Sequence, residues 1–355
     1  MADETNHYGA TAARTHGRPG RDVRPRSVTI DMHSHVMVPE AAALTQPHVD
    51  LSKVPLAHFA TEPTKALNRK QDQDRRPNMV DLGVRLADMD AAGIDVQIIM
   101  PPPPQCTYTV PLEIGIKAAR IVNAGLAAFA AQKPERFAAI GTVPMQDGKA
   151  AADELERSMR EDGMKGAHIL TSVNGLELSD PQFAPFWEKA EELGAVVLIH
   201  PNGFTEASRM TRFYFNNVIG NPLETTLALH YLIFDGVLAR HPGLKLIAVH
   251  GGGYLGGYSG RIDHAWGARS DARGELKEPP TTYLKRVYVD SVVFTPHQLR
   301  HLIEVFGPDH VLMGTDYPYD MAESDPVSHL ASAGLDEATF AKIAGGNAQA
   351  LFGLS

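Results

Sequence analysis

The strongest constraint on the fold of this chain is a unit that repeats from residue 28 onward. Each unit is a short β-rich apolar run, then a loop, then a longer amphipathic stretch. The eight runs begin VTIDMHSH (28–35), VQIIMPP (96–102), AAIGTVP (138–144), GAHIL (166–170), AVVLIHP (195–201), LKLIAVHGG (244–252), VYVDSVV (287–293) and VLMGTDYP (311–318). They are nearly continuously apolar, as expected of parallel strands that are covered on both faces. The pattern predicts an α/β fold with eight parallel strands.

Helices are expected between these strands. The candidates span residues 84–93, 111–132, 149–163 and 181–194. Asp180 and Pro181 suit the cap and the first helical position of the last of them. Gly93, Gly163 and Gly194 stand where a helix should end and turn toward the next strand. This alternation supports strand–helix units rather than separate all-α and all-β regions.

Eight such units form either a closed barrel or an open, doubly wound sheet. An open sheet that binds dinucleotides would carry a GxGxxG turn after its first strand. This chain has HSHVMVPE there. We therefore predict a (β/α)₈ TIM barrel, and its 355 residues are within the range of such barrels with insertions.

No internal boundary calls for a second domain, so residues 28–355 are predicted to form one domain. Residues 38–80 are a long insertion between the first strand and the first helix, rich in Pro, Asp, Asn and Arg. Long loops are usually functional or disordered, which makes this insertion a candidate lid or pocket wall. Residues 1–27 are predicted to be a flexible tail, or an arm ordered by a neighbouring subunit.

The composition of the chain limits the kinds of partner that it is expected to bind. The net charge of −9 argues against nucleic acid, which needs a basic face. No apolar run approaches the roughly 18–20 residues that span a bilayer. A single cysteine, Cys106, cannot form an internal disulfide, so a cytoplasmic location is expected.

The residues that could bind a metal ion or transfer protons lie at the ends of predicted strands. His33 and His35 are two residues apart, so both imidazoles point to the same face. His200, His250 and Asp316 end three later strands. The carboxyl ends of barrel strands meet at one rim, where barrel enzymes place their active sites.

Three imidazoles and one carboxylate suit a divalent metal ion. We predict that His33, His35, His200 and Asp316 hold one such ion, with Zn²⁺ expected and Mn²⁺ as the alternative. His250 is left as a general acid/base, and Asp316 can also accept a proton. Metal-bound water reaches a pKa of about 7 in favourable sites. The glycines that follow His250 allow the backbone to approach this site closely.

Several motifs together resemble a known family. IDMHSH, LIHP, VHGGG followed by GRIDHAW, and GTDYP occur in the order found in the decarboxylase-type branch of the amidohydrolase superfamily. The aminocarboxymuconate-semialdehyde decarboxylases are the most similar. The resemblance runs from about residue 28 to 352 and includes RLADMDAAGID and GNAQALF.

This resemblance implies the same metal ligands, with His250 catalytic. It implies non-oxidative carbon–carbon bond cleavage of an unsaturated or aromatic carboxylic acid, and a homodimer or higher homo-oligomer in which an arginine reaches a neighbouring active site. Binuclear members of the superfamily bridge two metals with a carboxylated lysine at the end of strand four. Strand four reads GAHILTS here, and the only nearby lysine, Lys165, precedes it. A single metal ion is therefore expected.

The chain departs from the family in its substrate region. The run after His200 reads HPNGF instead of a Pro-Trp-Asp sequence, and Tyr214 stands where the family carries tryptophan. Phe204 and Tyr214 are candidate walls for a substrate ring, as is Trp266. The substrate-carboxylate arginine should lie about a dozen residues before Arg85. The candidates are Arg69, Arg75 and Arg76.

Three functions follow from these residues. The first is decarboxylation, in which a proton replaces CO₂. The second is hydrolysis of a carbon–carbon or amide bond, or hydration of ring-cleavage products, on the same barrel. The third is a non-catalytic barrel that serves as a binding partner.

Overall fold

The computed structural model describes residues 18–274 and 276–354, and each of the eight predicted runs contains a parallel strand. The strands are β1 (Ile30–His35), β2 (Val96–Met100), β3 (Phe137–Ala139), β4 (Gly166–Leu170), β7 (Val196–His200), β8 (Lys245–Ala248), β9 (Tyr288–Asp290) and β10 (Val311–Leu312). An antiparallel hairpin, β5 (Ser172–Val173) with β6 (Leu176–Glu177), follows β4. The strand prediction is confirmed in number and order.

The parallel strands pair as two sheets, in the orders β1-β2-β3 and β10-β9-β8-β7-β4. Isolated parallel bridges join their outer strands, between Ser34 and Tyr317 and between Gly141 and Ala167. The molecule is thus an α/β fold with parallel sheets. In the described residues, regular pairing is interrupted between β3 and β4 and between β10 and β1, so a closed ladder is not formed.

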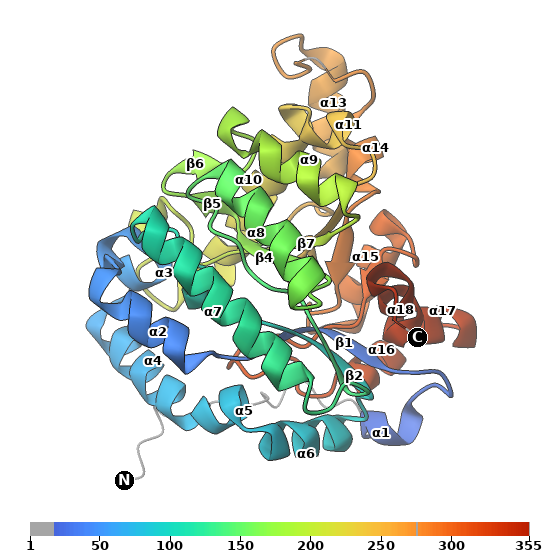
Figure 1. Ribbon diagram of the computed structural model, residues 1–355. Coiled ribbons are helices and arrows are strands. Elements are labelled where there is room, and N and C mark those ends of the chain that lie inside the picture. Colours follow the sequence, from blue (N-terminus) through green and yellow to red (C-terminus); the bar gives the residue numbers. More distant parts are fainter. Residues whose placement is uncertain (1–17, 275, 355) are drawn as a thin grey trace.

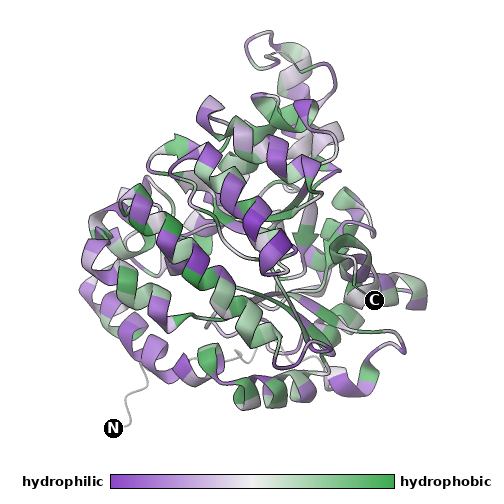
Figure 2. Cartoon of the chain, in the orientation of Figure 1, coloured by the Kyte–Doolittle hydropathy of each residue, from purple (hydrophilic) through white to green (hydrophobic). Residues whose placement is uncertain are grey.

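Helices cover the outer faces of the sheets (Figure 1). They are α1 (Gly20–Val23), α2 (Pro39–Thr45), α3 (Pro55–His58), α4 (Glu62–Asp74), α5 (Arg76–Val80), α6 (Leu82–Ala92), α7 (Leu112–Ala130), α8 (Gly148–Glu161), α9 (Ala184–Glu192), α10 (Asn221–Phe234), α11 (Val237–Arg240), α12 (Val249–Gly252), α13 (Ser259–Ala268), α14 (Pro280–Leu284), α15 (Pro296–Phe306), α16 (Pro326–Ser332), α17 (Glu337–Ala341) and α18 (Asn347–Phe352). Figure 2 shows hydrophilic residues along the outward faces of α7 and α8. None of the described helices is long and apolar enough to cross a membrane.

The predicted helix ends agree with the structure. The helices α6, α7, α8 and α9 fall within two to three residues of the predicted bounds, α9 being preceded by a 3₁₀ turn over Pro181–Phe183. The Asp180 carboxylate accepts a hydrogen bond from the Gln182 N–H, as a cap should. Gly93 and Gly194 have φ of 74° and 60°, a backbone region in which glycine is favoured because it lacks a Cβ.

The insertion at residues 38–80 is mostly helical, which the loop prediction did not anticipate. It contains α2, α3, α4 and α5, with two 3₁₀ turns between α2 and α3. The helix α4 begins at a cap in which the Thr61 hydroxyl accepts from the Thr64 N–H. Its sequence, EPTKALNRKQDQD, is polar on most sides, so it shows no clear apolar period.

Of the tail predicted over residues 1–27, residues 1–17 lie outside the described residues. The described part of this segment, residues 18–27, contacts the body of the protein, where α1 packs against α16. The Gly20 N–H donates to the Asp325 carboxylate at 3.0 and 3.1 Å, and the Ser328 hydroxyl donates to the Arg18 carbonyl at 2.7 Å.

Two apolar clusters form the core. The larger lies between strands and helices and includes Leu126 and Trp187. The smaller gathers inward-facing strand residues such as Met32 and Leu198, with Phe352 of α18. The register of β1 against β2 shifts between Asp31 and Ser34. Such an irregularity changes the local direction of side chains, and His33 lies within it.

Candidate metal centre

Five residues singled out in the sequence lie at the carboxyl ends of the strands. His33 and His35 end β1, His200 ends β7, His250 follows β8, and Asp316 follows β10. The first three and Asp316 are buried, whereas the His250 side chain is 16% exposed. The structure therefore brings together all five residues for which the sequence predicted metal binding or catalysis.

The Asp316 carboxylate lies at the centre of this group. Its oxygens are 3.1 Å from His35 Nε2, 3.4 Å from His33 Nε2, 3.5 Å from His250 Nε2 and 4.0 Å from His200 Nε2. One donor atom from each of His33, His200, His250 and Asp316 lies within 4.8 Å of the others. This spacing suits a single small cation among them.

Hydrogen bonds on the opposite ring nitrogens orient the imidazoles. His33 Nδ1 is 2.8 Å from the Asp290 carboxylate, His35 Nδ1 is 3.0 Å from the Pro101 carbonyl, and His200 Nδ1 is 2.6 Å from the Pro201 carbonyl. A protonated Nδ1 that donates to oxygen leaves Nε2 with its lone pair, and this arrangement is usual for metal-bound histidine.

The Nε2 atoms of His33 and His200 provide a test of whether a metal fits. In the described part of the chain, both atoms are buried and have no hydrogen-bond partner. A buried polar atom without a partner costs about 1–3 kcal/mol. Two such lone pairs beside a carboxylate make a donor set that a divalent cation would satisfy.

The electrostatics favour the ligand forms of Asp316, His35 and His200. Burial would raise the pKa of Asp316, but the neighbouring His33 and the other imidazoles hold it well below its usual range. Burial lowers the pKa of His200 to about 3 and also lowers that of His35. An ionised carboxylate and neutral imidazoles are the states that metal binding requires. Burial would also lower the pKa of His33, but Asp316 and Asp290 raise it.

The backbone is strained at two of these residues. His250 has φ of 55° and Asp316 has φ of 65°, in the left-handed region that non-glycine residues rarely adopt. Gly251 follows, and a Cβ there would lie 2.4 Å from a Val293 methyl group. No larger residue fits at Gly251 because of this contact with Val293; the expected approach of the glycines to the site itself stays a prediction.

Backbone pairing between β1 and the Asp316 segment fixes the centre. The Asp316 N–H donates to the His33 carbonyl and the His35 N–H to the Tyr317 carbonyl, both at 2.8 Å. The buried Arg85 also donates to the His35 carbonyl and, at 3.0 Å, to the Asn78 carbonyl. These hydrogen bonds fix the positions of His33, His35 and Asp316 through the main chain.

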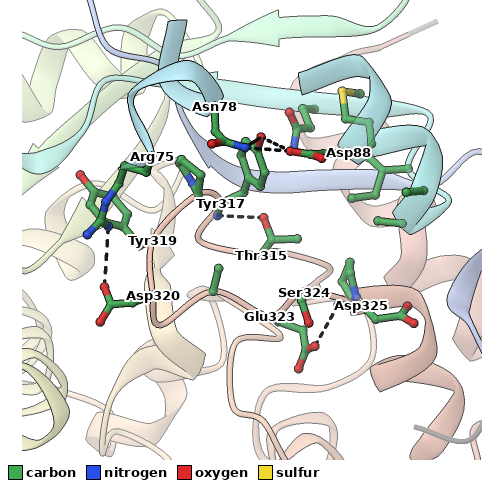
Figure 3. A pocket seen from close by; sticks show the side chains of 18 of the residues that line it. Arg75, Asn78, Asp88, Thr315, Tyr317, Tyr319, Asp320, Glu323, Ser324 and Asp325 are labelled. Atoms are coloured by element: carbon green, nitrogen blue, oxygen red, sulfur yellow. Dashed lines mark hydrogen bonds and ion pairs between the residues drawn. The ribbon is translucent and has the colours of Figure 1, made fainter. Parts of the chain in front are cut away.

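A cavity of about 500 Å³ lies next to the centre (Figure 3). Thr315 and Tyr317 line it, whereas Asp316 between them faces the imidazoles, so the cavity adjoins the centre without containing it. Arg75 and Tyr319 line its end, and the Arg75 guanidinium lies 4.8 Å from the centre of the Tyr319 ring. The Tyr319 ring in turn lies 5.2 Å from the His35 ring.

The three candidate arginines are placed differently. Arg69 and Arg76 are exposed on α4 and α5. The Arg75 side chain is only 10% exposed and lies 3.7 Å from the Asp320 carboxylate. Arg75 is therefore the one of the three that faces the region of the centre.

The three candidate walls for a substrate ring, Phe204, Tyr214 and Trp266, also lie in different places. Burial and the charge of Asp320 raise the pKa of the Tyr214 phenol, and Asp316 adds to this effect. Tyr214 thus lies among groups of the centre and the cavity. The N–H of Phe204, which is half-buried, donates to the Asn216 side chain at 2.8 Å. Trp266 lies on α13 with Arg273 over its ring, at the far end of the molecule in Figure 1.

Two residues of the centre were not proposed from the sequence. Asp290, on β9, orients His33, and His168, on β4, has its ring 5.3 Å from that of His200. Both lie on predicted strands, so the rule that selected the other residues could have found them.

The chain is similar to known proteins in sequence and in fold. The family model described as amidohydrolase matches residues 30–354. A 2-amino-3-carboxymuconate-6-semialdehyde decarboxylase of Dictyostelium discoideum is 32% identical, over 93% of this chain and 92% of that protein. The crystal structure of 5-carboxyvanillate decarboxylase from Sphingomonas paucimobilis is similar with a TM-score of 0.82 and 28% identity, over 92% of this chain and 99% of that one. A dihydroxybenzoic acid decarboxylase from Polaromonas sp. JS666, solved with bound manganese and the inhibitor 2-nitroresorcinol, has a TM-score of 0.79 and 26% identity, over 92% and 97% of the two chains.

Proposed function

We propose, from the premise that this chain belongs to the amidohydrolase family, that it removes CO₂ from an aromatic or unsaturated carboxylic acid with the help of one divalent metal ion. Its relatives named above are decarboxylases of such acids. The observation that carries the proposal is the convergence of buried imidazoles on the Asp316 carboxylate, with unsatisfied lone pairs on His33 and His200.

We assign His33, His35, His200 and Asp316 as the ligands. The spacing of donor atoms would also allow His250 in place of His35. His35 is favoured because its ring is fully buried and its Nδ1 is held by the Pro101 carbonyl. His250 is more exposed, as suits a group that exchanges protons. Zinc is expected from the donor set, and manganese is the alternative supported by the Polaromonas relative.

When bound, the ion would supply positive charge that orients a substrate oxygen and stabilises negative charge developing on it. The residues of the chain carry the remaining steps. His250, as an imidazolium, transfers a proton to the carbon that bears the carboxylate. The bond from this carbon to the carboxylate then breaks, CO₂ leaves, and the electron pair restores the unsaturation. His250 is left neutral and regains its proton from solvent.

Arg75 is proposed to bind a second anionic or polar group of the substrate. Its guanidinium is nearly buried, and Nη1 has no hydrogen-bond partner within the described residues. The Tyr319 ring beneath it reaches toward His35. A substrate held by Arg75 would therefore approach the metal side of the site, with Tyr214 and Phe204 as candidate walls for its ring.

Two sheets joined at both outer edges support a closed (β/α)₈ barrel as the architecture of one domain over residues 28–355. Backbone hydrogen bonds continue across the two interruptions, from the Met32 N–H to the Met313 carbonyl at 2.9 Å and from the Gly141 N–H to the Gly166 carbonyl at 3.0 Å. The helices of residues 38–80 lie beside the cavity through Arg75 and Asn78, so we retain a lid or wall role for this insertion. The cytoplasmic location remains a prediction.

A homodimer or higher homo-oligomer is proposed from an exposed apolar surface. Eight of the twelve large hydrophobic side chains that are exposed among the described residues lie in residues 213–231 and 254–258. The two segments touch, since the Tyr254 N–H donates to the Thr226 hydroxyl at 2.8 Å. A large apolar patch of this kind usually marks an interaction site. Replacing Phe213 and Tyr258, each 72% exposed, with serine should lower the mass measured by light scattering if a second copy covers this surface.

A substrate panel tests the proposed reaction. The purified protein, supplied with Zn²⁺ or Mn²⁺, is incubated with hydroxybenzoic and muconate-type acids. The masses of the products are measured by mass spectrometry. Decarboxylation gives a product lighter by CO₂ and releases CO₂. Release of a second organic acid from a substrate would instead indicate hydrolysis and contradict the proposal.

A further inference from the structure

Asp316 is held in a backbone conformation that it would leave without support. Its φ of 65° lies in the left-handed region, where a residue with a Cβ remains only if the surrounding structure holds it there. Two main-chain hydrogen bonds contribute, from the Asp316 N–H to the His33 carbonyl at 2.8 Å and from the Tyr319 N–H to the Asp316 carbonyl at 3.0 Å. The side chain of the preceding residue, Thr315, adds further contacts.

The Thr315 hydroxyl bridges the strained residue. It accepts from the Tyr317 N–H at 3.0 Å, so a hydrogen bond joins the two residues that flank Asp316 (Figure 3). The hydroxyl donates to the Asp31 carboxylate at 2.7 Å, since the His33 carbonyl, at 3.2 Å, is farther away and uncharged. Thr315 is only 3% exposed, so water does not readily replace these bonds.

The buried carboxylate of Asp31 anchors this hydroxyl. It also accepts from the Thr315 N–H at 3.0 Å and from the His33 N–H at 3.1 Å, so it joins β1 to the segment after β10. The Gln97 side chain donates to the same carboxylate at 2.9 Å and accepts from the buried Arg85 at 3.0 Å. A buried carboxylate is costly without such partners, and here the donors come from both metal-side segments.

We propose that Thr315, anchored by Asp31, is a positioning residue of the metal centre that holds Asp316 in its left-handed conformation. This conformation directs the Asp316 carboxylate at the imidazoles, whose Nε2 atoms lie 3.1 to 4.0 Å from its oxygens. The inference rests on the proposed function, because it gives the Thr315 hydroxyl the task of orienting a metal ligand. Thr315 acts through Asp316 and is not itself a ligand.

The experiment removes the Thr315 hydroxyl and then restores it. Thr315→Val has nearly the same shape but makes no hydrogen bond, whereas Thr315→Ser brings the hydroxyl back. Thr29→Val is the matched control, because Thr29 is fully buried just before β1 and its hydroxyl donates to the Gly93 carbonyl at 2.7 Å. For each full-length protein, the affinity for Mn²⁺ is measured by competition with a chelator and the electron paramagnetic resonance spectrum of bound Mn²⁺ is recorded. Urea unfolding gives the stability of each protein.

Thr315→Val should bind Mn²⁺ about 10- to 100-fold more weakly than the parent, with a changed zero-field splitting in the spectrum, because the carboxylate of Asp316 is no longer held in one orientation. Thr315→Ser should restore both, and Thr29→Val should keep both even where it loses stability. Parent-like affinity and spectrum in Thr315→Val would overturn the inference. So would an equal loss of affinity in Thr29→Val, or a serine variant that behaves like the valine variant.

The anchor is tested separately by Asp31→Asn, which keeps the size of the side chain and the Thr315 hydroxyl. The amide loses the charge and one acceptor oxygen, so Mn²⁺ affinity should fall and the spectrum should change in the same direction as in Thr315→Val. A parent-like spectrum would overturn the role given to Asp31.

Hydrogen exchange of the main chain gives a second readout that needs no metal. In metal-free protein, the amides of Asp316 and Tyr317 should exchange faster in Thr315→Val than in the parent or in Thr29→Val, as measured by mass spectrometry that resolves single residues. Unchanged exchange would overturn the inference. If the unsubstituted protein binds no divalent ion, the proposed function fails, and the exchange result still decides whether Thr315 holds Asp316.

Should Thr315→Val not fold, which circular dichroism would reveal, exchange in the unsubstituted protein decides. The Tyr317 amide, which donates to the Thr315 hydroxyl, should then exchange as slowly as that of Ile140, whose N–H donates to the Ile99 carbonyl inside the sheet. Exchange of the Tyr317 amide at the rate of an exposed loop would show that this hydroxyl does not hold the segment, and would overturn the inference without any substitution.

Discussion

The metal centre and the cavity beside it are built by different parts of the chain. The centre draws on strand ends whose main chains are bonded to each other, such as His33 and Asp316. The cavity is lined largely by side chains of α4, α5 and α6 and of the loop after Asp316. One region is fixed by the sheet. The other is fixed by α6, by the loop after Asp316 and by three residues of the insertion, Asp74, Arg75 and Asn78. We propose that the strand ends determine the chemistry and that the cavity beside them influences which substrate binds.

The largest expected effect is at the metal centre. Replacing His200 or Asp316 with alanine removes a ligand and leaves buried donors without their ion, so metal affinity should fall by more than about 100-fold and turnover should be lost. Elemental analysis of protein purified with and without added zinc measures this. His230→Ala serves as the control, since His230 lies on α10. Stoichiometric metal in either variant would contradict the ligand assignment.

Substituting His250 tests whether this residue is a metal ligand or a general acid/base of the same centre. His250→Ala should keep the metal and lower kcat by about 10²–10⁴-fold, the usual contribution of a general acid. His35→Ala should instead weaken metal binding. The opposite result, with metal lost from the His250 variant and kept in the His35 variant, would favour the donor group of His33, His200, His250 and Asp316 that lies within 4.8 Å.

The same division explains what the sequence could predict. His33, His35, His200, His250 and Asp316 were found because a strand end is recognisable from an apolar run, and parallel strands bring their ends together. The helices of the insertion were missed because a polar segment such as α4 shows little apolar periodicity. Arg75 could not be chosen over Arg69 or Arg76, since the side on which α4 and α5 pack depends on tertiary contacts.

The bulge in β1 marks a second limit of prediction. Alternation along a strand predicts that His33 and His35 share a face, but it does not say which face. The register of β1 against β2 shifts between Asp31 and Ser34, and no residue type in the segment predicts this irregularity. His168 lies in the middle of β4, and a single histidine within an apolar strand cannot be distinguished from a core residue by the sequence alone.

On the cavity side, Arg75→Gln should weaken substrate binding and leave the metal in place. Loss of a charged hydrogen bond costs about 1.5–3 kcal/mol, so KM should rise roughly 10- to 100-fold with a smaller change in kcat. Arg76→Gln, one residue away and exposed, is the matched control and should keep the parent KM. Equal effects at Arg75 and Arg76 would show that the insertion acts through its overall fold and not through this side chain.

The smallest effect is expected at Glu224 of α10, whose carboxylate contacts the loop after His200. Its carboxylate accepts from the Thr205 N–H at 3.2 Å and the Ser172 hydroxyl at 3.3 Å, and Thr205 lies in the loop after His200. Burial raises its pKa to about 7 from an ordinary value of 4.5.

Because the folded state of Glu224 holds a proton that the unfolded chain releases between pH 4.5 and 7, stability should fall as pH rises through this window. Glu224→Gln removes this dependence, since the amide stays neutral. Between pH 5 and pH 8, the free energy of unfolding of the variant should rise by about 1–2 kcal/mol relative to that of the parent. This difference is smaller than the full pKa shift implies, because the parent keeps its hydrogen bonds. Urea unfolding at the two pH values measures the difference. A parallel pH dependence in both proteins would mean that Glu224 titrates normally, and that the loop after His200 is more hydrated than its burial indicates.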